Sequence, residues 1–312
     1  MERRLEIKAE QEQKVDDILR RQLRCSSAVI RTAKGYPDGI LLDGVHATTA
    51  DKAKPGQVLS ILVSDRADGD LVAAQGPVDT VYEDADLLVV NKAAGVAAHP
   101  GPGHHDDTLG NFLTHHYKER GVPFVYRPAH RLDRNTSGLM VVARHAHAQE
   151  LLKQQLHTGD FQRTYLAVCQ RVPENEEGVI DQPIARADGS VLRREVRTDG
   201  ANAVTQYKVM STKDGRALVR LELETGRTHQ IRVHMSSLGC NLIGDQVYEK
   251  NKKSSLHFSS ATIKQKILSF PRQALHATTL GFIHPISKEK MSFSSEFPKD
   301  FTDLLTSLRL AE

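Results

Sequence analysis

The spacing of apolar residues predicts that the first 65 residues form two short helices followed by a hairpin. Apolar side chains recur at helical spacing at Val15, Ile18, Leu19 and Leu23. Ser26 or Ser27 can cap a second short helix that runs through Ile30. Asp43-Gly44 follows an apolar run and is a typical hairpin turn. Apolar residues between positions 58 and 63 predict the strand that closes this unit.

The pattern changes after residue 78 to short strands mixed with helices. Residues 66–78 are polar and rich in Asp, Gly and Ala, so we expect a linker. Buried strands are predicted at 87–90 and 139–142, and the alternation of apolar and charged residues at 219–223 predicts a half-buried strand. Helices are expected at Gly110–Arg120, His147–His157 and Thr228–Leu238. Because the strands do not alternate regularly with long helices, the pattern favours an α+β fold.

Composition and charge narrow the class of protein only slightly. The 312 residues include 42 Lys and Arg and 39 Asp and Glu, a net charge of +3 that permits an anionic partner without requiring one. Three widely spaced cysteines without a Cys-x-x-Cys pair argue against a disulfide framework or a cysteine zinc site. The sequence has no signal peptide and no apolar run of about 18 residues, so we expect a cytoplasmic monomer that does not enter the membrane.

A basic cluster lies on the predicted helices of the first 65 residues. Its members, with no acid among them, are Arg20, Arg21, Arg24, Arg31 and Lys34. A solvated helix surface explains such a cluster without any function. The order helix, helix, hairpin also resembles the S4 RNA-binding domain. This resemblance implies that residues 1–65 bind RNA through side chains such as Arg20 and Arg24.

The densest group of chemically active side chains lies between His130 and Gly138, directly before a buried strand. A loop held by a rigid strand is a common support for reactive groups. Asp133 stands between Arg131 and Arg134, which favour its ionised form. A purely structural hydrogen-bond network is the alternative explanation for such a loop.

A second group follows the alternating strand, at residues 224–234. Thr228 can cap a helix that Gly239 would end. The buried stripe of this helix would consist of Ile231, Met235 and Leu238. Arg232 then lies at the edge of the stripe, where it could reach inward and pair with a carboxylate as a fixed positive charge.

Four segments in a fixed order closely resemble the RluA-type pseudouridine synthase family. They are Asn91–Pro100 (N-K-x-x-G-x-x-x-H-P), His130–Leu139 (H-R-L-D-x-x-T-S-G-L), Arg163–Ala167 (R-T-Y-L-A) and Thr225–His234 (T-G-R-T-H-Q-I-R-V-H). The similarity continues through residues 241–245 and 272–277 and covers residues 80–300. One departure is Ala93, where the family usually has proline. Another is a longer lysine-rich stretch at 250–266, which could contact RNA or be a tolerated insertion.

The resemblance implies a catalytic domain over residues 79–312, built on a mixed, largely antiparallel sheet with RNA in a central basic cleft. It makes Asp133 the essential aspartate, Tyr165 the ring that stacks on the target base and Arg232 the partner of the aspartate. On its own, Tyr165 is more typical of a core residue. RNA contacts are expected from Arg131, Arg227, Lys92 and His99. The resemblance implies no metal and no cofactor, and it favours ribosomal RNA over transfer RNA as the substrate.

The implied reaction breaks the N1–C1′ bond of uridine, turns the freed uracil and joins C5 to C1′. The target base has to leave the RNA stack, and an aromatic platform can hold it. A carboxylate can act directly at the electron-poor C1′, or it can remove a sugar proton. The residues do not distinguish these two routes.

Two other classes of protein fit parts of the sequence. Among 15 histidines, His104-His105-Asp106-Asp107 suggests a metal hydrolase, but no ligand helix such as H-E-x-x-H accompanies it. A catalytically silent RNA-binding or ribosome-assembly protein would keep the scaffold. Such a protein has no need for the intact H-R-L-D and G-R-T-H-Q-I-R segments, so the sequence favours the enzyme.

Overall fold

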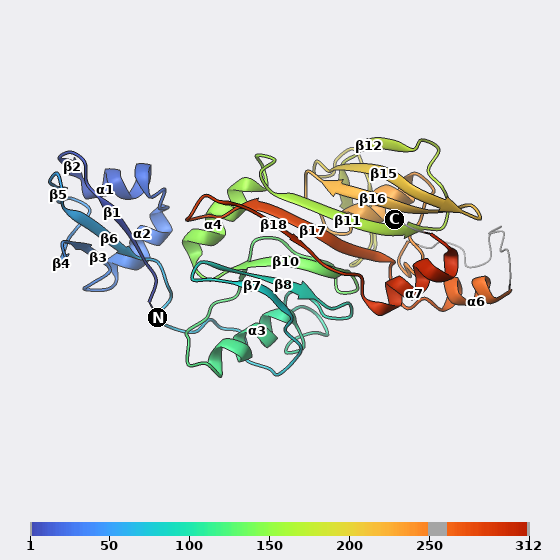
Figure 1. The fold of residues 1–312 in the computed structure, drawn as a ribbon, viewed down its shortest axis with the longest axis horizontal. Coiled ribbons are helices and arrows are strands. Elements are labelled where there is room, and N and C mark those ends of the chain that lie inside the picture. The colour runs from blue at the N-terminus through green and yellow to red at the C-terminus, as the bar shows by residue number, and fades with distance from the viewer. Residues whose placement is uncertain (1, 249–260, 311–312) are drawn as a thin grey trace.

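Two main sheets of unequal size organise the chain in the computed structural model, which describes residues 2–248 and 261–310. Figure 1 shows a small N-terminal unit at one end of the molecule and the large sheet along the rest of its length. None of the described helices combines the length and the apolar character needed to cross a membrane.

The N-terminal unit contains a four-stranded antiparallel sheet in the order β1-β6-β3-β4, with helices packed on it. Its elements are β1 (Arg4–Lys8), β2 (Gln13–Lys14), α1 (Val15–Asp17), a π-helical turn η1 (Ile18–Gln22), α2 (Ser27–Lys34), β3 (Ile40–Leu42), β4 (Val45–His46), β5 (Lys52–Ala53) and β6 (Val58–Leu62). The predicted helix, helix, hairpin order is confirmed. The likeness to an S4 domain stays a prediction.

The local sequence explains how this unit folds. The Ser26 hydroxyl accepts a hydrogen bond from the Val29 amide and caps α2, which continues past Ile30. Asp43 and Gly44 have φ angles of 47° and 81°, the backbone of a two-residue hairpin turn between β3 and β4. β6 pairs with both β1 and β3, so the predicted closing strand is confirmed.

The large sheet has ten strands, eight of them in the order β12-β15-β16-β11-β17-β10-β8-β7, with β18 on β17 and β9 on β10. Its strands are β7 (Thr80–Glu83), β8 (Leu87–Lys92), β9 (Arg127–Pro128), β10 (Ser137–Ala143), β11 (Gln162–Cys169), β12 (Glu177–Asp181), β15 (Val204–Lys213), β16 (Arg216–Leu223), β17 (Leu275–Ile283) and β18 (Lys290–Ser294). The other elements here are the hairpin of β13 (Ile184–Arg186) and β14 (Arg194–Val196), and the helices α3 (Leu109–Lys118), α4 (Ala146–Gln155), α5 (Gln230–Ser237), α6 (Ala261–Ser269) and α7 (Lys299–Leu308).

One parallel contact interrupts the antiparallel pairing of the described strands. It joins β10 to β17, where Ser137 and Gly138 lie beside His276 and Ala277. Gly138 makes this approach possible, because its φ is 113° and a Cβ there would lie 2.2 Å from the Ala277 carbonyl oxygen. The predicted α+β fold with a mixed, largely antiparallel sheet is therefore confirmed.

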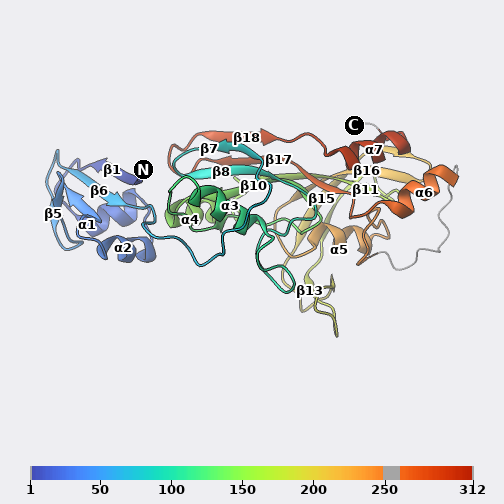
Figure 2. The ribbon, with the colours of Figure 1, turned by 90° about the horizontal axis from the view of Figure 1, so that it is seen from below.

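Alternation along the strands separates the two faces of the large sheet. On β11, Tyr165 belongs to the core that includes α5, whereas Leu166 belongs to the core that includes α7. Figure 2 shows α5 and α7 on opposite sides of the sheet. β16 alternates as predicted, with Leu221 buried between the exposed residues Arg220 and Glu222.

The start and the end of α5 differ from the prediction. The helix begins at Gln230, and Thr228 does not cap it. The Gln230 side chain instead accepts hydrogen bonds from the Arg227 amide at 2.9 Å and the Thr225 hydroxyl at 2.8 Å, which organises the turn before the helix. Leu238 is 41% exposed because it lies at the C-cap, beyond the last buried turn.

Two segments outside the regular elements were also singled out in the sequence. Residues 66–78 form no helix or strand, and their polar groups meet the following domain: Asp68 accepts a hydrogen bond from the Phe124 amide, and the Val72 carbonyl accepts one from Asn111. Most of the lysine-rich stretch, 250–260, lies outside the described residues. The domain limits at 65 and 78 stay a prediction.

Candidate active site

A cavity of about 480 Å³ brings side chains from all four motif segments together. It lies between the loop before β10, the face of β11 that carries Tyr165, the turn into α5, and α4. The predicted site residues that line it are His99, Arg131, Asp133, Tyr165, Arg227 and Arg232. A cavity of this size is typical of small-ligand sites.

Asp133 lies in the turn before β10, and hydrogen bonds fix the position of this turn. The Asp133 carbonyl accepts a hydrogen bond from the Thr136 amide at 3.0 Å. Gly95 holds the turn from one side, since its amide donates to the Arg134 carbonyl and its carbonyl accepts from the Arg134 guanidinium. Gln273 holds the other side by donating to the Thr136 hydroxyl at 3.2 Å. The segments that contain Gly95 and Gln273 therefore fix the position of the turn that carries Asp133.

Lys92, which was predicted to contact RNA, does not line the cavity, because it is buried against the same turn. Lys92 is 2% exposed, and its ammonium donates to the carbonyls of Ala93, Val96 and Arg134 at 2.8, 2.7 and 3.1 Å. These three acceptors use all three ammonium protons. Burial lowers the pKa of Lys92 to about 7, although the charge of Asp133 acts in the opposite direction. Lys92 therefore links the loop after β8 to the turn that follows Asp133.

Arg232, on α5, connects Asp133 to a second carboxylate. Its Nη1 donates to Asp133 Oδ2 at 3.0 Å, while Nε and Nη2 donate to the two oxygens of Asp245 at 2.7 and 2.8 Å. Asp245 is itself fixed by the backbone amides of Val247 and Tyr248, at 3.1 and 3.3 Å. The bidentate contact fixes the plane of the guanidinium and directs Nη1 at Asp133. The predicted contact between Asp133 and Arg232 is present.

The electrostatic surroundings give Asp133 one permanent positive neighbour. Burial alone would lower the pKa of Arg232, but the hydrogen bond and charge of Asp245, together with the charge of Asp133, raise it. The Tyr248 ring lies 5.1 Å from the Arg232 guanidinium carbon. His229 Nε2 is 3.8 Å from Asp133 Oδ2, and burial lowers the pKa of His229. At neutral pH the imidazole is therefore uncharged, and Arg232 supplies the cation.

Tyr165 forms part of the cavity wall. It is 5% exposed and lies on β11, on the face that packs with α5. Burial raises the pKa of its hydroxyl, so the phenol is neutral at physiological pH. A neutral aromatic ring in the wall of a cavity beside a carboxylate can pack against a planar base.

Three of the predicted RNA-contact residues lie at the cavity with exposed side chains: Arg131, Arg227 and His99. The Arg227 Nε donates to the Asn202 carbonyl at 2.8 Å. The His99 ring packs edge-on against Tyr126, with 5.2 Å between the ring centroids. The rim of the cavity is therefore basic.

The basic cluster of the N-terminal unit lies away from the cavity lining and is partly neutralised. Arg20 pairs with Asp16 at 2.8 Å, one turn earlier, and Arg21 is paired in the same way. The sequence argument overlooked these acids because it considered only residues after position 19. Arg24 donates to Gln154 of α4 at 2.7 Å, so it contacts the large domain.

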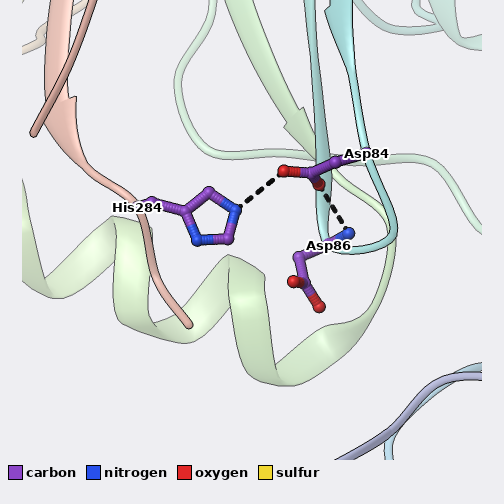
Figure 3. A group of neighbouring side chains, drawn as sticks. All are labelled: Asp84, Asp86 and His284. Carbon is purple, nitrogen blue, oxygen red and sulfur yellow. Dashed lines mark hydrogen bonds and ion pairs between the residues drawn. The ribbon is translucent and has the colours of Figure 1, made fainter. Parts of the chain in front are cut away.

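One group of three described side chains has the spacing of metal ligands: Asp84, Asp86 and His284. Figure 3 shows the His284 ring directed at the Asp84 carboxylate. The second Asp84 oxygen accepts a hydrogen bond from the Asp86 amide. Both Asp86 oxygens accept from Arg3, at 2.7 and 3.1 Å. Because every carboxylate oxygen already has a protein donor, we interpret the group as a structural junction that includes the N-terminal segment.

Two side chains at the site were not among the predicted residues. Asp245 belongs to the segment N-L-I-G-D, which the resemblance includes, but no role was assigned to it there. Its carboxylate is the main partner of Arg232. Arg163 is a cavity residue that precedes Tyr165 by two positions, and the alternation of β11 could have placed it on the same face.

Comparisons with known proteins identify the family. A model of the family described as RNA pseudouridylate synthase matches residues 86–237. A protein of Zymomonas mobilis named ribosomal large subunit pseudouridine synthase D is 42% identical over 241 residues, which cover 75% of this chain and 74% of that protein. An uncharacterized RNA pseudouridine synthase of Bacillus subtilis, YjbO, is 35% identical and covers 91% of this chain and 95% of its own length.

A solved structure supports the same conclusion. Human RNA pseudouridylate synthase domain containing 4 superposes with a TM-score of 0.59 at 29% identity, covering 74% of this chain and 93% of that chain. The metal-hydrolase alternative has no comparable support, since among the described residues His104 pairs with Asp107 and no third ligand joins them. The chain therefore belongs to the RNA pseudouridine synthase family, in its RluA-type branch, and is an isomerase that acts on RNA.

Proposed function

We propose that this enzyme isomerises uridines in large-subunit ribosomal RNA and that Asp133 is its catalytic carboxylate. The choice of RNA is supported by several relatives at 37–42% identity that are named ribosomal large subunit pseudouridine synthase D. The role of Asp133 is supported by one observation above all: its carboxylate lies in the cavity and is held by a guanidinium that a second, buried carboxylate fixes.

The carboxylate acts at the sugar of the target nucleotide. It either adds to C1′ or removes a sugar proton, and in both cases the C1′–N1 bond breaks with its electron pair left on the uracil. Arg232 keeps Asp133 oriented, because the bidentate contact with Asp245 leaves a single Nη1 donor for Asp133. The uracil then turns, and C5 replaces N1 at C1′.

The remaining cavity residues bind the target nucleotide. A base that is paired or stacked in RNA cannot reach Asp133, so the uridine has to be flipped into the cavity. Tyr165 packs against the flipped base, a contact of the kind that contributes about 1–3 kcal/mol. Arg131 and Arg227, at the rim, bind the phosphates on either side of it. Arg20 and Arg24 of the N-terminal unit add affinity for RNA and take no part in the chemistry.

The first prediction concerns Asp133 itself. In Asp133→Asn the shape of the side chain is kept and the charge is lost, so pseudouridine formation should fall below detection while RNA binding and thermal stability change little. The measurement is mass-spectrometric mapping of pseudouridine in large-subunit ribosomal RNA from cells with the wild-type protein, the variant or neither. Asp214→Asn is the matched control, because Asp214 is exposed in a β-turn at φ 49°, a conformation that asparagine also adopts.

The outcome separates the parts of the proposal. Turnover by a folded Asp133→Asn enzyme would refute the catalytic role. Loss of pseudouridine only from transfer RNA, in cells that lack the protein, would refute the ribosomal target and leave the chemistry intact. Full activity of Arg232→Lys would contradict the orienting role of the guanidinium, since lysine cannot contact Asp133 and both Asp245 oxygens with a planar fork.

A further inference from the structure

Arg163 is a buried cation in the cavity wall without an acidic partner. It is 6% exposed and lines the same cavity as Asp133 and Tyr165. Among the described residues no carboxylate lies within ion-pair distance of it, and its single hydrogen bond runs from Nη2 to the Leu223 carbonyl at 3.1 Å. A buried charge without a counter-charge is costly, so its retention calls for an explanation.

The two buried arginines of the cavity, Arg163 and Arg232, differ in this respect. Arg232 touches two carboxylates, which raise its pKa despite its burial. For Arg163, burial is the main influence and lowers the pKa; the opposing influence comes from the Tyr165 hydroxyl and not from a carboxylate. An arginine nevertheless keeps its proton in proteins. The protein therefore carries a positive charge in this wall that it does not itself neutralise.

The Arg163 guanidinium lies close to Gly226 in the turn before α5. Gly226 also lines the cavity, and a Cβ at Gly226 would lie 2.8 Å from Arg163 Nη1. The Arg163 guanidinium therefore lies directly against the backbone of the turn that precedes α5. Nη1 has no hydrogen-bond partner among the described residues. The two N–H groups of Arg163 Nη1 are therefore available as donors at the cavity.

Arg163 and Tyr165 occupy neighbouring positions on one face of β11. Residues two apart in a strand point to the same face and lie about 6.6 Å apart along it. A base that packs on the Tyr165 ring therefore has its edge within reach of the long Arg163 side chain. Phosphates are expected at the rim, where Arg131 and Arg227 are exposed. The nearly buried Arg163 is placed instead to contact the base that enters the cavity.

We propose that Arg163 is a catalytic residue that stabilises the uracil anion released when the C1′–N1 bond breaks; this inference rests on the proposed function. The electron pair of the broken bond spreads from N1 onto the carbonyl oxygens of the ring. The Arg163 guanidinium donates hydrogen bonds to one of these oxygens. When C5 bonds to C1′, the C5 proton is lost and N1 gains a proton, so the reaction stays an isomerisation. Donors placed where charge develops are a major source of catalysis.

The experiment compares two leaving groups. Single-turnover cleavage of the C1′–N1 bond is measured with RNA that carries uridine or 5-fluorouridine at the target position, because the electron-withdrawing fluorine stabilises the uracil anion. Arg163→Met should slow uridine conversion about 100–1000-fold with little change in KM, as expected for loss of one anion-stabilising donor. The loss should be at least tenfold smaller with 5-fluorouridine. Arg163→Lys, which keeps a charge, should lie between Met and wild type.

Other outcomes overturn the proposal. Equal losses on both substrates would indicate a structural role, and an effect confined to KM would indicate a phosphate contact. Arg220→Met, on the opposite face of the sheet, is the matched control and should behave as wild type on both RNAs. If Arg163→Met does not fold, Arg163→Lys supplies the same comparison. Failure of the wild-type enzyme itself to convert uridine would refute the proposed function, and is thereby distinct from failure of this inference.

Discussion

At the scale of single residues, Lys92 shows how a buried charge organises the loops around Asp133. Its ammonium donates to three carbonyls, on the loop after β8 and on the turn that follows Asp133. Neutral hydrophobic replacement would leave these carbonyls buried and without donors. Each such group costs roughly 1–3 kcal/mol.

We therefore expect Lys92→Met to destabilise the protein by on the order of 3 kcal/mol or more and to lower the rate of pseudouridine formation. The effect should depend on pH. Burial lowers the pKa of Lys92 to about 7, below the value of about 10.4 in an unfolded chain. Between these values the unfolded chain binds more protons, so the stability that Lys92 contributes is smallest below pH 7 and rises as the pH increases towards 10.4.

Urea unfolding of wild type and Lys92→Met at pH 6, 8 and 10 tests this prediction. The difference in unfolding free energy should widen with increasing pH. The exposed Lys290→Met on β18 is the control and should give a small, constant difference. A constant difference for Lys92→Met as well would show that the buried lysine has an ordinary pKa.

The sequence predicted the contact between Asp133 and Arg232 correctly, but it did not predict the residues that hold them in place. Helical geometry placed Arg232 at the edge of a buried stripe, where it could pair with a carboxylate, and the family resemblance implied that this carboxylate is Asp133. The bidentate partner Asp245 was not predicted, because nothing in a linear pattern states which of two acids will face a guanidinium. Lys92 was assigned to RNA as part of the family resemblance, and only the fold reveals the three carbonyls around it.

At the scale of elements, the contact between β10 and β17 holds in place the strand that follows the Asp133 turn. Gly138 is the point of closest approach, and its φ of 113° is accessible only to glycine. Gly138→Ala combines backbone strain with a Cβ placed 2.2 Å from the Ala277 carbonyl oxygen, so β10 has to move away from β17. The turn that carries Asp133 would move with β10.

We expect Gly138→Ala to unfold at a lower temperature and to lose most of its activity even below that temperature. Gly215→Ala is a suitable control, because Gly215 also has a positive φ, of 74°, but nothing lies within 4 Å of a Cβ there. The control variant should lose only the about 1–2 kcal/mol of stability that a positive φ costs alanine, and it should remain active. Thermal unfolding and single-turnover kinetics of both variants provide the measurement. Wild-type activity of Gly138→Ala would contradict the close packing of the two strands.

Elements with strong periodicity were predicted well, and those that depend on tertiary contacts were not. The strand at 219–223 and the cap at Ser26 follow from local chemistry. The first turn of α5 does not, because the Gln230 side chain also donates to Thr205 of a neighbouring strand and so organises the turn through a contact distant in sequence. The parallel β10–β17 pairing likewise joins segments more than 130 residues apart.

At the scale of the whole molecule, charged contacts hold the N-terminal unit against the large domain. Arg3 donates to both oxygens of Asp86, which also accepts a hydrogen bond from His145 at the start of α4. Ala146 and Ile286 of the large domain pack against the core of the N-terminal unit. Burial opposes the ionisation of Asp86, but the hydrogen bonds from His145 and Arg3 outweigh it and lower the pKa.

We expect Arg3→Ala to loosen the N-terminal unit from the large domain without unfolding either part. Hydrogen exchange should become faster for amides at the junction, while catalysis on a short RNA is kept. Arg4→Ala is the matched control, since Arg4 pairs with Asp38 inside the N-terminal unit. Because the pKa of Asp86 is lowered, its contribution is complete above about pH 4 and is lost as the pH falls further, so the wild-type junction should loosen in acid. Unchanged exchange at the junction in Arg3→Ala would contradict this anchoring role.

The position of β17 has a consequence for when the enzyme can first work. β17 lies between β10 and β11 in the sheet, although it follows both in the sequence. A polypeptide that has left the ribosome only as far as α5 already exposes Asp133, Tyr165 and Arg232, but β17, which joins β10 to β11, has not yet emerged. The sheet that supports Asp133 and Tyr165 is therefore incomplete during synthesis until residues 275–283 have emerged and inserted between β10 and β11.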